Sequence, residues 1–228
     1  MGKSDPYLNP NSIRFNFRRR RFRKIAALID QVIQEKGFCN ILDVGGSEVY
    51  WLIGSDYLSR AAKNIKITLV NLERIEVADK SLFTSKVCDA CDLAEFKDQS
   101  FDLVHSNSVI EHVGSWDRMK QFAGEVRRLA PVYYIQTPYF WFPFEPHYSS
   151  WGYHWLPQNI QAKRLMSKRR GPFVRQSDIS NAMDIVQHVG LLDKRQFAFL
   201  FPDADFEHEK IFGITKSLIA VKRQSSGQ

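Results

Sequence analysis

The sequence has few cysteines and no long apolar run. Only three of its 228 residues are cysteines, an odd number that is typical of a chain kept in a reducing compartment. No uninterrupted apolar stretch approaches the ~20 residues that a membrane-spanning helix needs. Residues 1–16 are polar and lack the apolar core of a secretory signal. We therefore expect a cytoplasmic protein.

A long linker rich in glycine, serine or proline is also missing, which argues against several domains. The apolar content is 44%, enough for a chain of this length to bury one sizeable core. We expect a single domain over residues 1–228. Within it, residues 1–37 should form a basic helical segment and residues 139–175 an inserted lid.

Cys88 and Cys91 form a Cys-x-x-Cys pair, a spacing that zinc sites and redox couples use. A zinc site needs two more ligands, and Cys39 lies in a predicted strand from which it cannot easily supply one. Redox pairs stand at the start of a helix, whereas this pair lies in a predicted loop. We interpret both as loop residues and predict no metal site.

Apolar patterning alternates between helices and strands along the chain. Apolar residues recur at helical spacing over residues 18–34, and Gly37 ends that helix. Strands are predicted at residues 40–44, 66–71, 84–88, 101–106 and 132–136, with a helix at 116–129 before the last of them. After the insertion we predict a helix at 178–189 capped by Ser177, a helix at 193–201, and a hairpin of residues 206–211 and 216–222.

The most informative motif is the run Ile-Leu-Asp-Val-Gly-Gly at residues 41–46. It predicts a strand, a tight glycine turn and the start of a helix, the arrangement by which a doubly wound sheet holds a nucleotide-like cofactor. The pattern Asp-x-Gly differs from the Gly-x-Gly-x-x-Gly of a dinucleotide site. A carboxylate before the turn suits a cationic amino-acid moiety better than a pyrophosphate, which favours S-adenosylmethionine (SAM).

Two further blocks follow in order. Residues 101–113, which read Phe-Asp-Leu-Val-His-Ser-Asn-Ser-Val-Ile-Glu-His-Val, resemble the fourth strand and following turn of class I SAM-dependent methyltransferases. Residues 88–93 resemble the acidic loop that follows their third strand. The closest resemblance is to the bacterial methyltransferase type 11 branch, some of whose members also carry the segments found here at 136–138, 145–147 and 215–220.

The resemblance implies an α/β fold with a Rossmann-like, doubly wound, seven-stranded sheet. The sheet should be mostly parallel with its last strand antiparallel, covered by helices on both faces, and interrupted by an aromatic insertion after strand five. The order of the matching blocks, over roughly residues 38–137, agrees with that fold. The carboxyl ends of the parallel strands should then form one rim.

We expect the cofactor on that rim. Asp43 would hold the glycine turn and, through water, the methionine ammonium, while Asn71 and Glu73 would bind the ribose and Asp89 the adenine amine. The full predicted set is Asp43, Gly45, Gly46, Ser47, Asn71, Leu72, Glu73, Asp89, Ala90 and Asn107. The chain departs from the family at Ser47 and Val49, which replace glycines, and at Asn71, which replaces an acid.

The predicted lid is rich in aromatic residues, as binding lids often are. Such walls suit a small-molecule, glycan or lipid-linked acceptor, and the predicted acceptor contacts are Tyr139, Trp141, Glu145, His147, Tyr148 and His154. His147 is the first candidate for a general base, because an imidazole titrates near neutral pH. His112 and Glu111, after strand four, are the second candidates.

The net charge of +7 is concentrated in residues 14–24 and 163–175. Such runs bind an anionic membrane surface or RNA phosphates, or form a solvated face. We favour the solvated face or a weak contact with a membrane or an anionic acceptor, because no RNA-binding module accompanies the core. The predicted function is methyl transfer from SAM to an acceptor hydroxyl. The alternatives are an RNA methyltransferase and a non-catalytic binding subunit, the latter suggested by Ser47, Val49 and Asn71.

Overall fold

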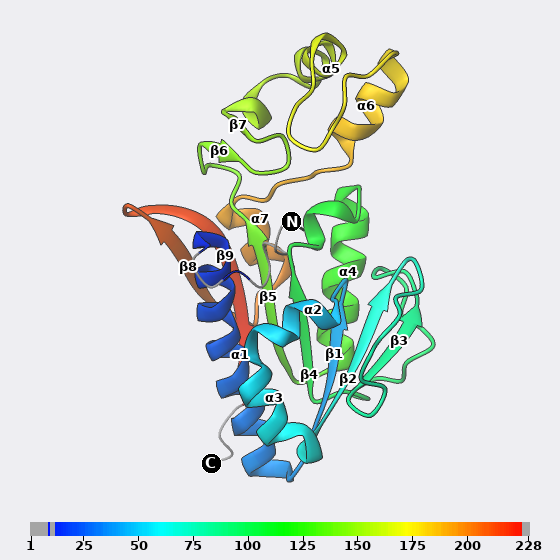
Figure 1. Cartoon of the computed structure of the whole chain (residues 1–228), viewed down its shortest axis with the longest axis vertical. Helices are drawn as coiled ribbons and strands as arrows, with labels where there is room; N and C mark the ends of the chain where they lie inside the picture. Colours follow the sequence, from blue (N-terminus) through cyan, green and yellow to red (C-terminus); the bar gives the residue numbers. More distant parts are fainter. Residues whose placement is uncertain (1–8, 10–11, 225–228) are drawn as a thin grey trace.

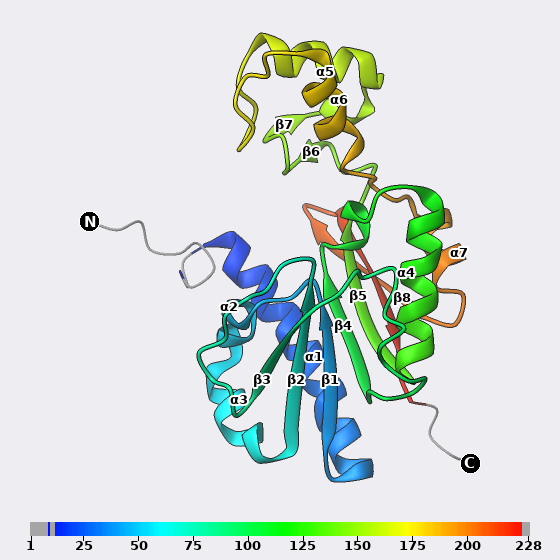
Figure 2. The same ribbon diagram turned by 90° about the vertical axis from the view of Figure 1, so that its right-hand side faces the viewer.

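A seven-stranded sheet with helices on both faces forms the body of the molecule in this computed structural model, which describes residue 9 and residues 12–224 (Figures 1 and 2). The strand order is β3-β2-β1-β4-β5-β9-β8. The predicted fold class is confirmed. The remainder of the predicted N-terminal segment, residues 1–8 and 10–11, lies outside the described residues, as do residues 225–228 at the other end.

Five strands run parallel: β1 (Cys39–Val44), β2 (Ile65–Asn71), β3 (Phe83–Val87), β4 (Leu103–Asn107) and β5 (Val132–Pro138). The last strand, β9 (Ile214–Lys222), is antiparallel to β5 and to β8 (Asp205–Ile211), as predicted. Strand β1 is almost wholly buried, because a parallel strand at the centre of the sheet is covered on both faces. The strand order reverses beside β1, where such sheets bind ligands.

Helices cover both faces of the sheet and bury two apolar clusters. One face carries α1 (Ile13–Lys36), α2 (Glu48–Trp51), η1 (Leu52–Gly54), α3 (Ser55–Ala61) and η2 (Ala62–Asn64). The other face carries α4 (Trp116–Leu129) and α7 (Lys194–Leu200). Helix α4 has the predicted bounds, because Ser115 caps its first turn and Met119, Phe122 and Val126 form an apolar stripe toward the sheet.

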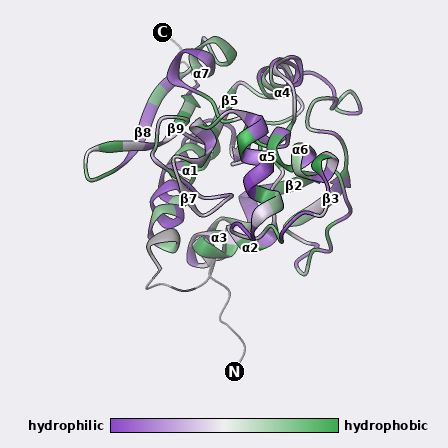
Figure 3. Ribbon diagram, turned by 90° about the horizontal axis from the view of Figure 1, so that it is seen from above, coloured by the Kyte–Doolittle hydropathy of each residue, from purple (hydrophilic) through white to green (hydrophobic). Residues whose placement is uncertain are grey.

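A separate structure follows β5 and lies beyond the carboxyl ends of the strands (Figure 1). It contains β6 (Phe144–Glu145), β7 (Ser150–Trp151), η4 (Tyr153–Trp155), α5 (Gln158–Ser167) and α6 (Ile179–Gln187). Its own apolar cluster consists of Tyr148, Tyr153, Ala162, Leu165, Ala182 and Val186. Seen from above, the helices of this structure lie over the sheet (Figure 3). We call residues 139–189 the lid.

Two sequence predictions about this region need correction. The lid is longer than the predicted 139–175, because α6 contributes Ala182 and Val186 to the lid cluster. The cap of α6 is Asp178, whose Oδ1 accepts a hydrogen bond from the backbone N–H of Asn181 at 2.9 Å, while Ser177 only donates to Asp178.

Within the described part of the chain, none of the helices combines the length and hydropathy of a membrane span.

Candidate active site

The glycine turn after β1 needs both of its glycines. Gly45 has φ +70°, and a Cβ there would lie 2.4 Å from the Val109 side chain. A Cβ on Gly46 would lie 1.7 Å from the Asp43 carboxylate. Ser47 follows as the N-cap of α2, and its hydroxyl makes no capping hydrogen bond. A side chain at either position would therefore collide with the protein itself.

Asp43 lies beneath this turn and is fully buried. Its Oδ2 accepts a hydrogen bond from Trp51 Nε1 at 2.7 Å, and its Oδ1 accepts one from His105 Nδ1 at 2.6 Å. Because a carboxylate can only accept, both partners must donate. These bonds explain how Asp43 supports the turn. Its predicted water-mediated contact with an ammonium group stays a prediction.

Other predicted cofactor residues stand at neighbouring strand ends. Asn71, at the end of β2, donates through Nδ2 to the Gly46 carbonyl at 3.0 Å and so ties β2 to the glycine turn. Leu72 and Glu73 follow it and are exposed, with 73% of Leu72 accessible. The apolar surface of Leu72 is therefore free to face a flat ring. The contacts predicted for these three residues are not tested by the structure.

The loop after β3 holds Asp89 in a defined position. Both Asp89 carboxylate oxygens accept from Arg118 Nη2 at 2.7 Å, and Oδ1 also accepts from the backbone N–H of Cys91 at 2.9 Å. The Arg118 bonds are the main reason why the pKa of Asp89 is lowered. Ala90, the next residue, is half-buried. Asp89 is thus held as a carboxylate at the rim, where an adenine amine would have to share it with Arg118.

Cys88 and Cys91 have different partners in this loop. Cys88 Sγ donates to Glu95 Oε1 at 2.5 Å, and Cys91 Sγ donates to the Arg118 carbonyl at 3.2 Å. Burial raises the pKa of each thiol to about 11, so both are protonated at neutral pH. This geometry agrees with their interpretation as loop residues.

Arg21 is a residue of the rim that sequence reasoning missed. It comes from α1, and its side chain is buried against the ends of β4 and β5. The guanidinium donates to Asn107 Oδ1 at 2.5 Å and to Gln136 Oε1 at 2.9 Å, and it pairs with Glu209 through two bonds of 2.7 and 2.8 Å. Asn107, a predicted cofactor residue, is therefore oriented by α1. A buried arginine inside a basic run carries no local signal.

The three candidate catalytic residues lie together. Glu111 and His112 belong to η3 (Ile110–His112) after β4, and His147 belongs to the lid. One ligand-type atom of each lies within 4.8 Å of the others, and His112 Nε2 is 3.1 Å from His147 Nε2. We call Glu111, His112 and His147 the Glu–His cluster. Among the described residues it is the one group of three or more His, Cys, Asp and Glu side chains this close together.

Two carboxylates support this cluster. Glu145 is buried, its Oε1 lies 2.6 Å from His147 Nδ1, and its Oε2 accepts from the Tyr148 backbone N–H at 2.8 Å. Glu111 is also buried, and its Oε2 accepts from Thr137 Oγ1 at 2.9 Å. The other oxygen, Glu111 Oε1, has no hydrogen-bond partner among the described residues.

Burial and neighbouring charges shift the pKa values of the three cluster residues in different directions. Burial by itself would lower the pKa of His147, but the hydrogen bond and charge of Glu145 outweigh it and raise that pKa. Burial lowers the pKa of His112 to about 4, and the nearby His147 and His188 add to this effect. Burial raises the pKa of Glu111 to about 7. His112 is therefore neutral at physiological pH.

A cavity of about 320 Å³ lies within the lid and reaches this cluster through Glu145. Its wall includes the predicted acceptor residues Glu145, Tyr148 and His154, together with Phe140 and Gln161. His154 Nε2 donates to the Phe140 carbonyl at 2.7 Å. Tyr139 and Trp141, also predicted, lie outside the cavity wall, and Trp141 is exposed.

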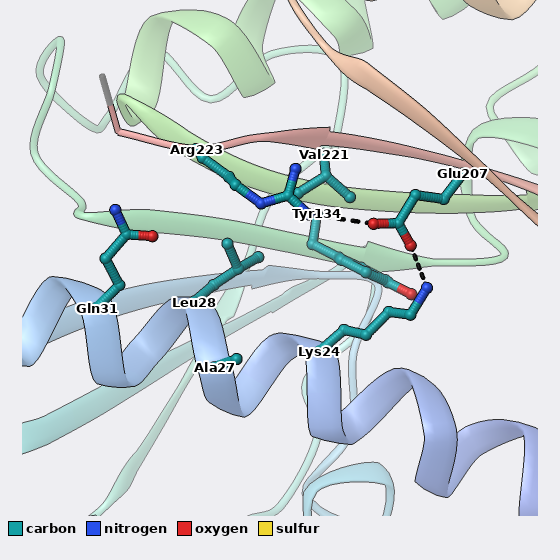
Figure 4. A pocket seen from close by; sticks show the side chains of 8 residues that line it. All are labelled: Lys24, Ala27, Leu28, Gln31, Tyr134, Glu207, Val221 and Arg223. Atoms are coloured by element: carbon teal, nitrogen blue, oxygen red, sulfur yellow. Dashed lines mark hydrogen bonds and ion pairs between the residues drawn. The ribbon is translucent and has the colours of Figure 1, made fainter. Parts of the chain in front are cut away.

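A second cavity, of about 170 Å³, lies between α1 and strands β5, β8 and β9 (Figure 4). Glu207 pairs there with Lys24 and, at 3.1 Å, with Arg223. No residue of the predicted site lines it. Its ion pairs join α1 and Arg223 to Glu207 of β8, and the candidate active site stays the one predicted at the rim beneath the lid.

Comparison with known proteins shows what the fold and one domain of the chain resemble. Residues 45–131 match a family model described as a methyltransferase domain, of the type 11 branch, and no curated protein matches the chain. The chain is similar to the structure of a SAM-dependent methyltransferase from Archaeoglobus fulgidus, with 14% identity, coverage of 91% of this chain and 94% of that one, and a TM-score of 0.53. It is also similar to the DszA carbon methyltransferase, with 10% identity, coverage of 97% of this chain and 58% of that one, and a TM-score of 0.57.

At these identities the structural likeness shows the fold, which is that of class I SAM-dependent methyltransferases. The family match adds the activity. Over residues 45–131 the chain matches the methyltransferase-domain model, which supports an enzyme with SAM-dependent methyltransferase activity and SAM as its cofactor. The resemblance predicted from the sequence is confirmed, and the non-catalytic alternative is set aside.

The residues at the rim fit this cofactor. Gly45 and Gly46 keep side chains out of the turn, because a Cβ on either would collide with Val109 or Asp43, and the methionine moiety would approach their bare backbone. Exposed Leu72 offers an apolar face for the adenine ring, and Asp89 offers a carboxylate acceptor that Arg118 fixes. These are the residues that would hold the cofactor in this chain.

Proposed function

We propose that the enzyme methylates a hydroxyl group of a small-molecule, glycan or lipid-linked acceptor that is bound in the lid cavity. The observation that carries this proposal is the position of Glu145, which lines the cavity and holds His147. An acceptor seated in the cavity would thus have one end beside the Glu–His cluster. Aromatic walls with a few polar groups, such as Gln161 and His154, suit a sugar or another amphipathic acceptor.

Bound SAM supplies an electrophilic methyl carbon, which the acceptor oxygen attacks while the sulfur keeps the electrons of the broken bond. The residues of this chain have two tasks: to align the acceptor oxygen, and to take up its proton. The lid cavity would perform the first task. The Glu–His cluster would perform the second, since it offers two imidazole nitrogens and a carboxylate oxygen at one point.

His147 as the proton acceptor stays a prediction, and it has a definite pH dependence. An imidazole accepts a proton only when neutral, and the pKa of His147 is raised by Glu145. Turnover should therefore be low at acidic pH and rise as the pH passes through this raised pKa. Glu145→Gln would remove the charge that raises it, so the rise should move to lower pH.

The decisive experiment compares His147→Gln with the wild type. We expect turnover to fall about a hundredfold or more, the usual worth of a positioned proton acceptor, while calorimetry shows unchanged affinity for S-adenosylhomocysteine. Release of S-adenosylhomocysteine would be followed over a panel of hydroxyl-bearing sugars, and mass spectrometry would locate the added methyl group. The matched control is His208→Gln on β8, an exposed histidine outside the site. Full turnover of His147→Gln, or a methyl group on nitrogen or carbon, would contradict the proposal.

The structure offers less support for an RNA acceptor. Two cations of the first basic run form ion pairs with acidic residues of the same chain: Arg21 pairs with Glu209, and Lys24 pairs with Glu207. The second basic run, at residues 163–175, lies in α5 and the loop after it, on the lid. A weak contact of this run with an anionic surface remains a proposal that accompanies a lipid-linked acceptor.

A further inference from the structure

The Glu–His cluster contains more groups than proton uptake requires. One imidazole backed by one carboxylate, such as His147 with Glu145, is a sufficient proton acceptor. The structure adds a second imidazole and a second buried carboxylate, His112 and Glu111, on the other side of His147. Their arrangement needs a separate explanation.

The two imidazoles meet in a way that suits a shared cation. His112 Nε2 and His147 Nε2 are 3.1 Å apart. Two nitrogens bound to the same zinc ion at about 2.0–2.1 Å lie about 2.9–3.4 Å from each other at octahedral or tetrahedral angles. The observed separation falls in that range. In the absence of a cation, the Nε2–H of one ring has to donate a hydrogen bond to the unprotonated Nε2 of the other.

Glu111 supplies the third donor and an independent sign of a missing partner. Its side chain is fully buried, and Oε1 has no hydrogen-bond partner within the described residues. A buried carboxylate oxygen without a partner is costly, because it has lost its water and gained nothing in exchange. Oε2 is already held by Thr137, which fixes the orientation of the group. A cation beside Oε1 would satisfy the open oxygen.

A supporting carboxylate orients one of the ligands, His147, as in known metal sites. Histidines that bind metals usually donate their other ring N–H to a carboxylate, which fixes the tautomer and the ring orientation. Glu145 Oε1 stands in this position, 2.6 Å from His147 Nδ1. His147 Nε2 is thereby left without its proton and faces His112. The Gly190 backbone N–H donates to the Glu111 carbonyl at 2.7 Å and so anchors the segment after the lid beside the cluster.

We propose that Glu111, His112 and His147 bind one divalent first-row transition-metal cation. Two imidazoles and a carboxylate suit ions such as Zn²⁺, Mn²⁺ or Fe²⁺ better than Mg²⁺ or Ca²⁺, which prefer oxygen donors throughout. Three protein ligands leave further coordination positions open. The site combines residues from η3 and from the lid, so a bound cation would also fix the lid to the rim of the sheet.

The catalytic consequence of this cation rests on the proposed function. An acceptor hydroxyl bound at an open position would lose its proton more readily, because the cation stabilises the negative oxygen. The proton would leave to solvent, and His147 would then serve as a ligand in place of a proton acceptor. Cation binding itself does not depend on the identity of the acceptor, so it can be tested alone.

The test uses the full chain after treatment with a chelator and extensive dialysis. Titration with Zn²⁺ and with Mn²⁺ by calorimetry, in the absence of SAM and acceptor, should show one equivalent bound by the wild type. His147→Gln and His112→Gln should each weaken this binding by more than the roughly 10- to 100-fold that the loss of an outer-shell partner costs. Glu145→Gln should weaken it by about that 10- to 100-fold amount. His208→Gln should bind as the wild type does.

Absence of binding by the stripped wild type, or equal binding by His147→Gln and the wild type, would overturn the proposal. Binding that disappears in Cys88→Ser/Cys91→Ser, and persists in the histidine variants, would overturn it as well. His147→Gln changes a lid residue and leaves η3 intact, so it tests the cation site without disturbing the buried Glu111.

Loss of turnover in His147→Gln without any cation binding would leave the proposed function standing, with His147 as the proton acceptor. Cation binding without methylation of any hydroxyl acceptor would support the metal site and overturn the proposed function.

Discussion

The cofactor side and the acceptor side of the active site hold their buried carboxylates differently. On the cofactor side both Asp43 oxygens accept a hydrogen bond, one from Trp51 and one from His105, although His105 Nε2 is itself buried without a partner among the described residues. On the acceptor side Glu111 Oε1 and His154 Nδ1 are buried without partners among the described residues. The carboxylate of the first side is satisfied within the protein. The carboxylate of the second side leaves Glu111 Oε1 open to a ligand.

The two sides also differ in how they are held. The glycine turn and the strand ends rest on two large apolar clusters, one on each face of the sheet. The lid rests on a cluster of its own, built from six buried residues. A change in the lid cluster should therefore be felt locally, whereas a change beneath the glycine turn should affect the whole fold.

The largest effect is expected for Asp43→Ala. This change leaves two buried donors, Trp51 Nε1 and His105 Nδ1, without an acceptor, and should lower the free energy of unfolding by about 2–5 kcal/mol. Urea denaturation followed by circular dichroism measures it. The control is Asp56→Asn on the exposed side of α3, expected within about 0.5 kcal/mol of the wild type. Equal stability of Asp43→Ala and the wild type would show that the cofactor side does not depend on this carboxylate.

The next effect concerns the lid. Leu165 is fully buried in the lid cluster, and truncation of such a residue to alanine costs about 2–5 kcal/mol. Because the cluster is separate, Leu165→Ala should speed proteolytic cleavage within the lid and leave the affinity for S-adenosylhomocysteine unchanged. Leu129→Ala, in the sheet cluster, should instead lower the stability of the whole molecule. A fall in cofactor affinity as large in Leu165→Ala as in Leu129→Ala would break the distinction between the two sides.

A smaller effect is expected for Asn71→Asp. The amide of Asn71 donates to the Gly46 carbonyl, and a carboxylate at this position cannot donate. The lost hydrogen bond, worth about 0.5–1.5 kcal/mol, should weaken S-adenosylhomocysteine binding roughly two- to tenfold. Calorimetry would measure the change, with Asn64→Asp as a control outside the rim. Tighter binding would show that the new carboxylate binds the ribose and that the tie to the turn is dispensable.

The smallest effect concerns the edge of the sheet. Burial by itself would raise the pKa of Asp203, but hydrogen bonds from Lys222 and Tyr133 outweigh it and lower that pKa. A carboxyl whose pKa is lower in the folded state contributes stability above its unfolded pKa, and this contribution is lost as the pH falls below about 4. Since Asp203 is partly exposed, solvent screening reduces the contribution to a few tenths of a kcal/mol. Thermal melts of Asp203→Asn and the wild type should differ at pH 7 and converge at pH 3. A constant difference at both pH values would contradict this assignment.

Local signals predicted much of the fold correctly. The helix predicted at residues 116–129 has the bounds of α4, because the apolar stripe on which the prediction rests is a property of consecutive residues. The Asp-x-Gly motif predicted the glycine turn, because the conformation of Gly45 is a property of the turn itself. The cap of α6 was wrong by one residue, since Ser177 and Asp178 both favour that position and only the backbone conformation selects Asp178.

Contacts between distant segments could not be predicted in the same way. Arg21 lies in a run of four arginines, and nothing local distinguishes it from its exposed neighbour Arg20. Its burial depends on Glu209, 188 residues further along the chain. The extent of the lid was also missed, because α6 joins α5 through packing and not through any sequence continuity.

The sequence by itself determined that this chain forms a doubly wound sheet with a glycine turn after its first strand, because apolar periodicity and the need for Gly45 and Gly46 are properties of neighbouring residues. It also singled out Glu111, His112 and His147 as separate candidates. Only the tertiary structure decided that these three side chains share one point. His147 lies 35 residues from His112, and their meeting depends on how the lid is anchored over the carboxyl ends of the strands. Such a contact depends on packing across the whole fold, which no short pattern of residues records.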